Sequence, residues 1–390
     1  MVQGFFASGI HAGIKKTNDK DLGLIVSDVP VTVAGVFTKN QIKAAPVVLD
    51  MERIESGICQ AIIVNSGNAN CCTGKQGMKH AMQMTKAVAD TIKIPEKNVL
   101  VSSTGVIGEP MPVDKACAGV PDLVNGLSED GFLNFAQAIM TTDTKPKLIS
   151  KTIETDAGSF SITGVAKGAG MIRPDMATML CYVCTDVEAD TAVLKQILTD
   201  AVDKSFNRIT IDGDTSTNDT VLVMANGKSG VSLADPLNKE IFEKALDDML
   251  IELAKMIVKD GEGATKLVEI IIKGAASIAD AQTISDTIAN SNLVKTAFFG
   301  EDANWGRIIG ALGRAGVPVN PDTIDIFFND VQMVKKGLGC GKDVEAEAAK
   351  VLKLPEFEVV VDLNMGNGFS SCWTCDFSID YVKINADYRT

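Results

Sequence analysis

Strand-like and helix-like segments alternate along most of this chain, and the alternation constrains its fold more than any other feature. The apolar run AIIVNSG (residues 61–67) predicts a buried strand that ends in a polar loop. Apolar residues then recur at helical spacing from Met78 to Ile92, and Pro95 ends that pattern. The first part of the chain therefore predicts strands mixed with amphipathic helices.

The same mixture continues to the end of the chain. Further strands are predicted at 98–104, 179–187, 266–276, 356–365 and 382–390, and further helices at 128–140, 194–202 and 235–257. The chain has 390 residues, more than the roughly 250–300 at which a single hydrophobic core stops growing. We therefore expect two domains or one large layered domain.

Charge and hydropathy exclude several classes of protein. The 50 acidic residues outnumber the 37 basic ones, and no Lys/Arg stripe is present to follow a phosphate backbone. No apolar run reaches the roughly 18 residues of a membrane helix. Residues 1–16 lack the basic start and apolar stretch of a secretory signal. We expect a cytoplasmic protein without nucleic acid or membrane partners.

The nine cysteines are expected to be free thiols. Their number is odd, and a chain of this length does not need disulfides to stabilise it. Cys181/Cys184 and Cys372/Cys375 have the spacing of zinc ligands. Both pairs lie in segments predicted as strands, where residues three apart point to opposite faces and do not grip one ion. We therefore predict no metal site.

Three polar loops rich in Gly, Asn and Thr each follow a strand-like run. They are NSGNAN (65–70), SSTGVIG (102–108) and DGDTSTNDT (212–220). These residue types favour turns because they bond to their own backbone, so a purely structural role is the alternative to a functional one. A calcium-binding loop is excluded, because Thr217 and Val223 occupy the places of its required Gly and Glu.

The segment KGAGMIRPDMATML (167–180) contains a candidate nucleophile, Thr178. Since the only histidines are His11 and His80, a threonine here needs another base. The α-amine of an N-terminal threonine, with a pKa of about 7.7–8.0, supplies one. Attack of Thr178 on the carbonyl of Ala177, followed by hydrolysis, would create that terminus. The alternative is a loop that simply enters a strand.

Motifs along nearly the whole chain resemble those of the ornithine acetyltransferase family, the bifunctional arginine-biosynthesis proteins with glutamate N-acetyltransferase activity. They are GIHAGIKK, AAPV, NSGNAN, SSTGVIG, MTTDT, KGAGMIRPDMATML, DGDTSTND, DGEGATK, KTAFFGEDANWGRI and NADYRT. The resemblance implies an α/β fold with layered sheets and helices of the ornithine acetyltransferase and aminopeptidase type, similar to N-terminal nucleophile hydrolases. It also implies self-cleavage into an alpha fragment, 1–177, and a beta fragment, 178–390.

The resemblance further assigns roles to individual residues. Thr178 would be the nucleophile, released by cleavage after Ala177, and Thr104 and Gly105 would form the oxyanion hole. The implied substrate contacts are Thr141 or Thr142, Lys167, Thr178, Glu262, Asn385 and Thr390. This set suits an α-amino acid, because Glu262 can pair with an ammonium group and Lys167 with a carboxylate.

The implied reaction moves an acetyl group from N2-acetyl-L-ornithine to L-glutamate through an acetyl-Thr178 ester. Ping-pong kinetics are expected, because ornithine must leave before glutamate enters. No metal or redox cofactor is implied. Whether acetyl-CoA is a second donor stays open, and the two fragments are expected to assemble into a heterotetramer or a larger particle.

Two other functions remain as alternatives. An N-terminal nucleophile amidohydrolase or aminopeptidase would use the same cleavage chemistry with water as acceptor. A non-enzymatic nucleotide-binding protein built on the Gly-rich loops would show neither chain cleavage nor a covalent acyl adduct. The KGAG sequence does not fit a phosphate-binding P-loop, because its Lys167 precedes the glycines rather than following them.

Overall fold

The computed structural model describes residues 2–173 and 179–387 of the protein, which form two compact units. Unit 1 contains the described residues 2–169, 179–207 and 214–257, and unit 2 contains 170–173, 208–213 and 258–387. Two units are one of the two arrangements expected from the chain length. They are defined by packing, and the division into fragments 1–177 and 178–390 stays a prediction.

Unit 1 is built on one large sheet, in the order β4-β3-β2-β9-β7-β6-β5, with β1 paired to β2. The pairs β3/β4 and β7/β9 are parallel, and the other neighbours are antiparallel. The strands are β1 (Phe5–Ile10), β2 (Leu22–Phe37), β3 (Ile58–Asn68), β4 (Val99–Val106), β5 (Lys147–Thr155), β6 (Gly158–Lys167), β7 (Leu180–Thr185) and β9 (Thr220–Ala225).

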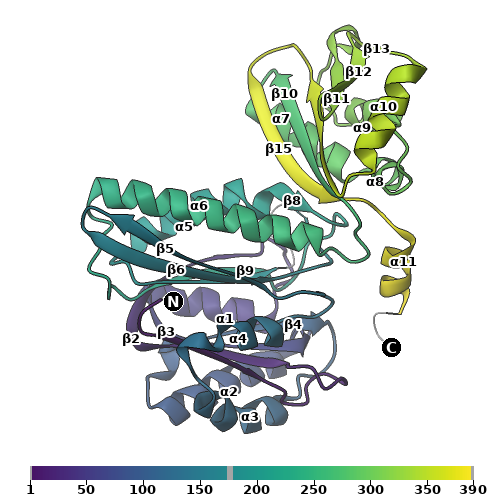
Figure 1. The fold of residues 1–390 in the computed structure, drawn as a ribbon. Helices are drawn as coiled ribbons and strands as arrows, with labels where there is room; N and C mark the ends of the chain where they lie inside the picture. Colours follow the sequence, from purple (N-terminus) through teal and green to yellow (C-terminus); the bar gives the residue numbers. More distant parts are fainter. Residues whose placement is uncertain (1, 174–178, 388–390) are drawn as a thin grey trace. The chain divides into compact units, whose positions relative to one another are not determined.

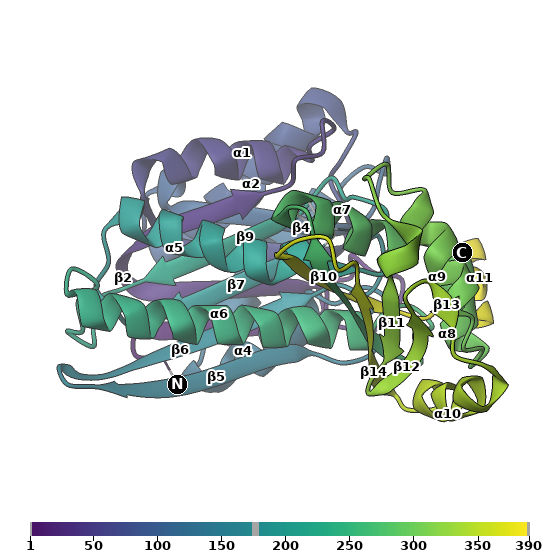
Figure 2. The ribbon, with the colours of Figure 1, turned by 90° about the horizontal axis from the view of Figure 1, so that it is seen from above.

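Helices pack against this sheet, as Figure 1 shows for α6 beside β5 and β6 and for α2 and α3 beside β2 and β3. The helices are α1 (Ala45–Arg53), α2 (Gly74–Ile92), α3 (Val113–Asn125), α4 (Phe132–Ala138), α5 (Thr191–Lys204) and α6 (Pro236–Lys259), the last two residues of which belong to unit 2. Short 3-10 helices are η1 (Ile54–Ser56), η2 (Glu96–Asn98), η3 (Glu129–Gly131) and η4 (Phe206–Arg208). Figure 2 shows α6 lying along the hairpin β5–β6, where Phe242 packs on Phe160 with ring centroids 5.8 Å apart.

The long strand β2 connects the two halves of the sheet. Its first part pairs with β3 and its last part with β9, and the register shifts between Val26 and Val31. Two apolar clusters form around it. One surrounds Phe135 and Tyr182, whose rings meet edge to face with centroids 5.5 Å apart, and the other packs α2 and α3 against β3 and β4. Burial of both clusters stabilises the sheet at the ends of β3 and β4, where polar loops begin.

Unit 2 has its own sheet, in the order β13-β12-β11-β14-β10-β15-β8. Its strands are β8 (Ile209–Thr210), β10 (Leu267–Ala275), β11 (Asp325–Phe328), β12 (Val331–Lys335), β13 (Leu338–Gly339), β14 (Glu356–Asp362) and β15 (Gly368–Cys375). Its helices are α7 (Ile278–Ala289), α8 (Asn292–Phe299), α9 (Trp305–Gly313), α10 (Lys342–Leu352) and α11 (Ile379–Ala386), with a 3-10 turn, η5, at Pro321–Thr323. The α/β class with layered sheets and helices is therefore confirmed.

One sequence prediction is wrong at the C-terminus. The segment 382–390 was expected to be extended, but its first residues belong to helix α11 (Ile379–Ala386). The Ser378 side chain caps this helix by accepting a hydrogen bond from the backbone N–H of Tyr381, and such a cap satisfies a backbone donor that a short helix otherwise leaves free. Residues 388–390 lie outside the described part of the chain.

The cysteines are unpaired and the two close pairs lie on strands, as predicted. All nine cysteines are free thiols, Cys181 and Cys184 lie on β7, and Cys372 and Cys375 lie on β15. Across residues 2–173 and 179–387, no three or more His, Cys, Asp or Glu side chains gather in a way that could hold a metal ion. Within the same ranges, no helix has the length and apolar character needed to cross a membrane.

Candidate active site

The three polar segments predicted as loops contact one another in unit 1, but 65–68 and 102–106 continue strands β3 and β4 rather than forming loops. Asn218, in the loop before β9, donates from Nδ2 to the carbonyl oxygens of Ala69 (2.7 Å) and Ser103 (2.8 Å). The Ser103 hydroxyl in turn donates to Oδ1 of Asn65 at 2.6 Å. Each of the three segments therefore bonds to another one, which separates this arrangement from three independent turns.

Gly105 occupies a position in this site that requires glycine. Its φ of 131° lies in the region that disfavours side chains. A Cβ there would lie 2.4 Å from the carbonyl carbon of Gly67 and 2.6 Å from the nitrogen of Asn68. The backbone at Thr104–Gly105 is thus held closely against Gly67 and Asn68 at the end of β3, as a fixed oxyanion hole requires.

Lys167, at the end of β6, links residues from separate parts of the chain. Its Nζ donates to Oγ1 of Thr141 at 2.8 Å and to Oγ1 of Thr104 at 3.3 Å. Its side chain is only 3% exposed. Because each hydroxyl accepts a bond from the ammonium group, its own proton is available for another acceptor. Thr104 can therefore donate to a developing oxyanion.

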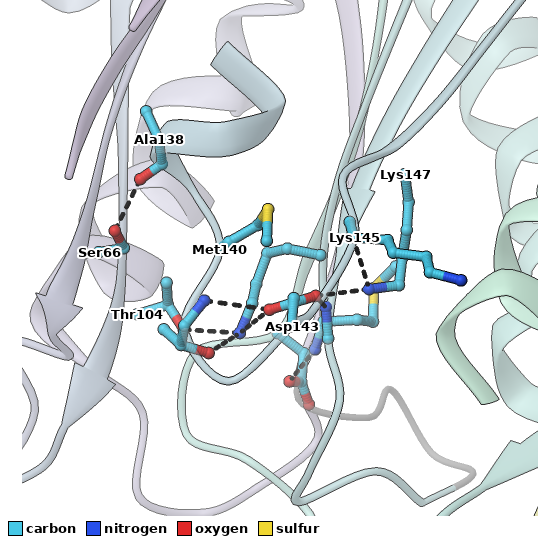
Figure 3. A network of polar contacts seen from close by, with 12 residues as sticks. Ser66, Thr104, Ala138, Met140, Asp143, Lys145 and Lys147 are labelled. Atoms are coloured by element: carbon cyan, nitrogen blue, oxygen red, sulfur yellow. Dashed lines mark hydrogen bonds and ion pairs between the residues drawn. The ribbon is translucent and has the colours of Figure 1, made fainter. Parts of the chain in front are cut away.

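Asp143 lies at the centre of the charged network in Figure 3. Its Oδ1 lies 2.7 Å from the buried Nζ of Lys147 and accepts from the N–H of Gly168 at 2.7 Å, and its Oδ2 lies 3.8 Å from Lys167 Nζ. Burial alone would raise the pKa of this carboxyl group, but the ammonium groups of Lys167 and Lys147 and these hydrogen bonds hold the pKa well below its ordinary value. Within this cluster, two cations face one carboxylate, an arrangement that favours an anionic ligand group.

The segment that carries Thr141 is held on two sides (Figure 3). The Ser66 hydroxyl donates to the carbonyl oxygen of Ala138 at 2.6 Å. Lys15 Nζ donates to the carbonyl oxygen of Met140 at 2.8 Å, and burial, together with the nearby Lys167 charge, lowers the pKa of this lysine. These bonds fix the chain just before Thr141. Thr141 is therefore held in place for its contact with Lys167.

In unit 2, Glu262 and Asn385 form a separate polar pair. Asn385 Nδ2 donates to Oε2 of Glu262 at 2.7 Å, and Glu262 is buried. Gly170 lies against this carboxylate, since a Cβ there would be 2.5 Å from the Glu262 carboxyl carbon. A glycine at 170 therefore leaves room for Glu262.

Asp212 holds the chain that leads toward the proposed cleavage site. Its carboxylate accepts from the N–H of Met171 (2.6 Å) and of Ile172 (2.8 Å), and from the Tyr381 hydroxyl (3.2 Å). Met171 has a φ of 57°, a left-handed conformation that costs a non-glycine residue roughly 1–2 kcal/mol. The bonds from Asp212 offset this strain within unit 2.

The predicted site residues therefore fall into two groups. Thr104, Gly105, Thr141 and Lys167 lie together in unit 1. Glu262 and Asn385 lie together in unit 2. Three further predicted site residues, Ala177, Thr178 and Thr390, lie outside the described part of the chain.

Sequence reasoning missed Asp143, Lys147, Asn218 and Asp219. Asp143 and Lys147 lie in TTDTKPK, which reads as a connecting loop, and both are buried in the structure. Their spacing of four residues and opposite charges were the available signal. Asn218 and Asp219 lie in a loop whose residue types also suit an ordinary turn.

Comparison with known proteins gives one consistent result. The model of the ArgJ family matches residues 6–390. The arginine biosynthesis bifunctional protein ArgJ of Geobacter sulfurreducens is 53% identical over 391 residues, covering 100% of both chains, and the protein of that name from Desulfotalea psychrophila is 52% identical over 396 residues, again covering 100% of both. A crystal structure of arginine biosynthesis bifunctional protein ArgJ from Bacillus halodurans is 43% identical and covers 52% of this chain and 95% of that chain, with a TM-score of 0.49.

Proposed function

This chain belongs to the ArgJ family, and from this premise we propose that it is a self-cleaving acetyltransferase of arginine biosynthesis. It moves an acetyl group from N2-acetyl-L-ornithine to L-glutamate, with Thr178 as the nucleophile. The observation that carries the proposal is the buried contact of Lys167 with Thr104 and Thr141. Three residues that the family resemblance links to catalysis and substrate binding meet there through their reactive groups.

Self-cleavage creates the nucleophile. The Thr178 hydroxyl oxygen adds to the carbonyl carbon of Ala177, the Ala177–Thr178 C–N bond breaks, and the proton lost by the hydroxyl ends on the Thr178 nitrogen. Water then hydrolyses the ester, which leaves a carboxylate on Ala177 and a free α-amine on Thr178. The products are fragments 1–177 and 178–390.

Acetyl transfer uses that α-amine as the base. It accepts the hydroxyl proton as the Thr178 oxygen attacks the acetyl carbonyl, and the Thr104 hydroxyl and Gly105 N–H stabilise the oxyanion. The proton passes to the departing amine of ornithine, which leaves acetyl-Thr178. The amine of glutamate then attacks this ester, N-acetylglutamate leaves, and the Thr178 hydroxyl is restored.

Substrate recognition follows the charges of the two groups of residues. Lys167 supplies a cation suited to a substrate carboxylate, and Glu262, oriented by Asn385, supplies an anion suited to an ammonium group. Thr390 is retained as a further predicted contact. The proposal also includes acetyl-CoA as a second donor, a cytoplasmic location, and a heterotetramer or larger assembly of the two fragments.

Intact mass spectrometry of the purified protein tests this function. We expect fragments 1–177 and 178–390, and after brief exposure to N-acetylornithine the second fragment should carry one added acetyl group. A Thr178→Ala variant should remain a single chain and show no transfer, because it lacks the attacking hydroxyl. Full activity in that variant would contradict the mechanism.

The choice of acceptor separates the transferase from an amidohydrolase. With N-acetylornithine as donor, release of ornithine should depend on glutamate and yield N-acetylglutamate. If water serves as well as glutamate, with acetate as the product, the hydrolase alternative is correct. Replacing N-acetylornithine by acetyl-CoA in the same assay tests the second donor.

A further inference from the structure

Two adjacent residues in the loop before β9 contact the sequence neighbours of the proposed catalytic groups. Asn218 Nδ2 donates to the carbonyl oxygen of Ser103 at 2.8 Å, and Ser103 directly precedes Thr104. Asn218 is buried, and its Oδ1 accepts from the Thr217 hydroxyl at 2.6 Å. Its amide is therefore fixed in one orientation and holds the end of β4.

Asp219 makes the corresponding contact with the residue that follows Thr178 in the chain. Its Oδ1 accepts from the backbone N–H of Met179 at 3.1 Å, and Met179 directly follows Thr178. The next residue, Thr220, donates from its backbone N–H to the carbonyl oxygen of Met179 at 3.2 Å. Met179 is therefore held through both of its backbone polar groups.

The loop that carries these residues is itself anchored to Thr38, which directly follows β2. Thr38 donates from its backbone N–H to the carbonyl oxygen of Asp219 (3.0 Å) and from its hydroxyl to that of Ser216 (2.7 Å). Loop 216–219 is thus a rigid bridge within unit 1. Its last two residues make the two contacts: Asn218 holds Ser103 on β4, and Asp219 holds Met179, which directly precedes β7.

We propose that Asn218 and Asp219 are positioning residues: Asn218 holds Ser103, which precedes the Thr104–Gly105 oxyanion hole in the chain, and Asp219 holds Met179, which follows the Thr178 nucleophile. This inference rests on the proposed function, because it takes Thr178 as the nucleophile. Neither residue transfers a proton. Each acts through the backbone group that it bonds, so the reaction geometry in self-cleavage and in acetyl transfer depends on both.

The surroundings of Asp219 favour a neutral carboxyl group in this role. The residue is fully buried, and burial raises its pKa well above the ordinary value; the hydrogen bond from Met179, the hydroxyls of Thr38 and Ser216 and the charge of Lys167 offset only part of that rise. A neutral carboxyl group and a carboxamide each offer Met179 one acceptor oxygen, so Asp219→Asn is the conservative variant at this position.

Substitution at Asp219 tests the inference. Asp219→Asn keeps an oxygen that accepts from Met179, so self-cleavage and kcat should stay close to those of the wild type. Asp219→Ala removes the acceptor, and both rates should fall about 100-fold, as expected for a misplacement of about 1 Å. The KM for N-acetylornithine should not change, because no proposed substrate contact is touched. Asn218→Ala should likewise lower kcat and leave KM unchanged.

The rate of self-cleavage is followed by mass spectrometry after cell-free synthesis, and acetyl transfer is followed by steady-state kinetics. Asp248→Asn on the exposed face of α6 removes one acidic group far from this loop in sequence and serves as the matched control. Folding of each variant is checked by thermal unfolding. If Asp219→Ala does not fold, Asn218→Ala and Asp219→Asn still give the decisive comparison.

Each outcome supports or overturns the inference. Rescue by Asp219→Asn, with losses in kcat alone for the alanine variants, supports it. Wild-type rates in a folded alanine variant overturn it, and so does an Asp219→Asn protein as slow as Asp219→Ala. Thr178→Ala, measured in parallel, distinguishes failure of the proposed function from failure of this inference. Activity in the Thr178→Ala protein refutes the proposed function. If that protein is inactive but Asp219→Ala is fully active, only this inference is refuted.

Discussion

The polar cluster of unit 1 and the polar pair of unit 2 differ in how firmly they are held. In unit 1, Lys167, Asp143 and Lys147 are almost completely buried, and Asp143 contacts two ammonium groups and a backbone N–H. In unit 2, the Glu262 carboxylate bonds to the Asn385 amide, and Asn385 lies on an exposed helix, α11. One region is fixed by several buried charged contacts, and the other depends on a hydrogen bond from an exposed side chain.

This difference suits the two regions to different tasks: the cluster of unit 1 to stabilising a transition state, and the pair of unit 2 to recognising a substrate. Groups that stabilise a developing charge are most effective when they are oriented before the reaction, in a site that excludes water. A recognition pair can instead exchange one hydrogen bond for another when a ligand binds. We therefore expect substitutions in unit 1 to lower stability or kcat, and substitutions in unit 2 to raise KM.

The largest effect is expected from Asp143→Ala. Removal of this carboxylate leaves the buried ammonium groups of Lys147 and Lys167 without their counter-charge, and breaking a buried ion pair in this way costs about 3–5 kcal/mol. The free energy of unfolding, measured in urea, should fall by that amount. The rate of acetyl transfer should fall as well.

A matched pair of residues on the surface provides the control. Lys86 and Asp90 on α2 also lie four residues apart and are bonded at 2.8 Å, but both are exposed, so Asp90→Ala should leave stability unchanged. The pKa of Asp143 is lower in the folded protein, so its contribution to stability is complete above the unfolded pKa of about 3.9 and is lost as the pH falls below it. A wild-type protein no more acid-sensitive than Asp143→Ala would contradict this assignment.

A smaller effect, confined to kcat, is expected from Thr104→Ala. Loss of one oxyanion donor lowers kcat by about 10²- to 10³-fold, and the protein should still fold, because Lys167 keeps its contacts with Thr141 and Asp143. Thr104→Ser retains the hydroxyl and should recover most of the activity. Steady-state kinetics checks both variants; equal losses in the alanine and serine proteins would show that the hydroxyl is not the active group.

The smallest effect is expected from Glu262→Gln in unit 2. The amide keeps the shape of the side chain but removes the charge, and the loss of a charge-assisted hydrogen bond of about 1.5–3 kcal/mol lowers kcat/KM about 10- to 100-fold. The loss should appear in KM for N-acetylornithine, with kcat little changed. Glu358→Gln on the exposed side of β14 is the control. A selective fall in kcat would instead place Glu262 in the chemical step.

The fold could be predicted from the sequence wherever an element shows a long periodic pattern. Helix α2 and strands β3 and β4 were predicted because burial imposes their apolar spacing. The C-terminal segment was assigned wrongly, because α11 is a short helix that depends on the Ser378 cap rather than on a buried face. The predicted helix at 128–140 is present in part, as a 3-10 turn followed by α4 (Phe132–Ala138).

The candidate site could be predicted only where residues fall in recognisable motifs. The resemblance picked out Thr104, Lys167 and Glu262, but no local pattern reveals that Asp143 bonds to Lys167, because that contact joins the segment before β5 to the end of β6. The same limit hid the role of Asn218, whose partners Ala69 and Ser103 are more than 100 positions away in the chain. Such contacts depend on strand order, which residue types alone do not encode.

The strand order in unit 1 has a consequence for a chain cut between Ala177 and Thr178. Strand β7, which follows the proposed cut, lies between β6, which precedes it, and β9, and β9 in turn pairs with β2 from the first fragment. The fragments would thus be interleaved within one sheet, and their separation would require global unfolding. Recovery after denaturation would then become bimolecular, so its yield would depend on protein concentration, whereas the uncut chain would refold at a rate independent of it.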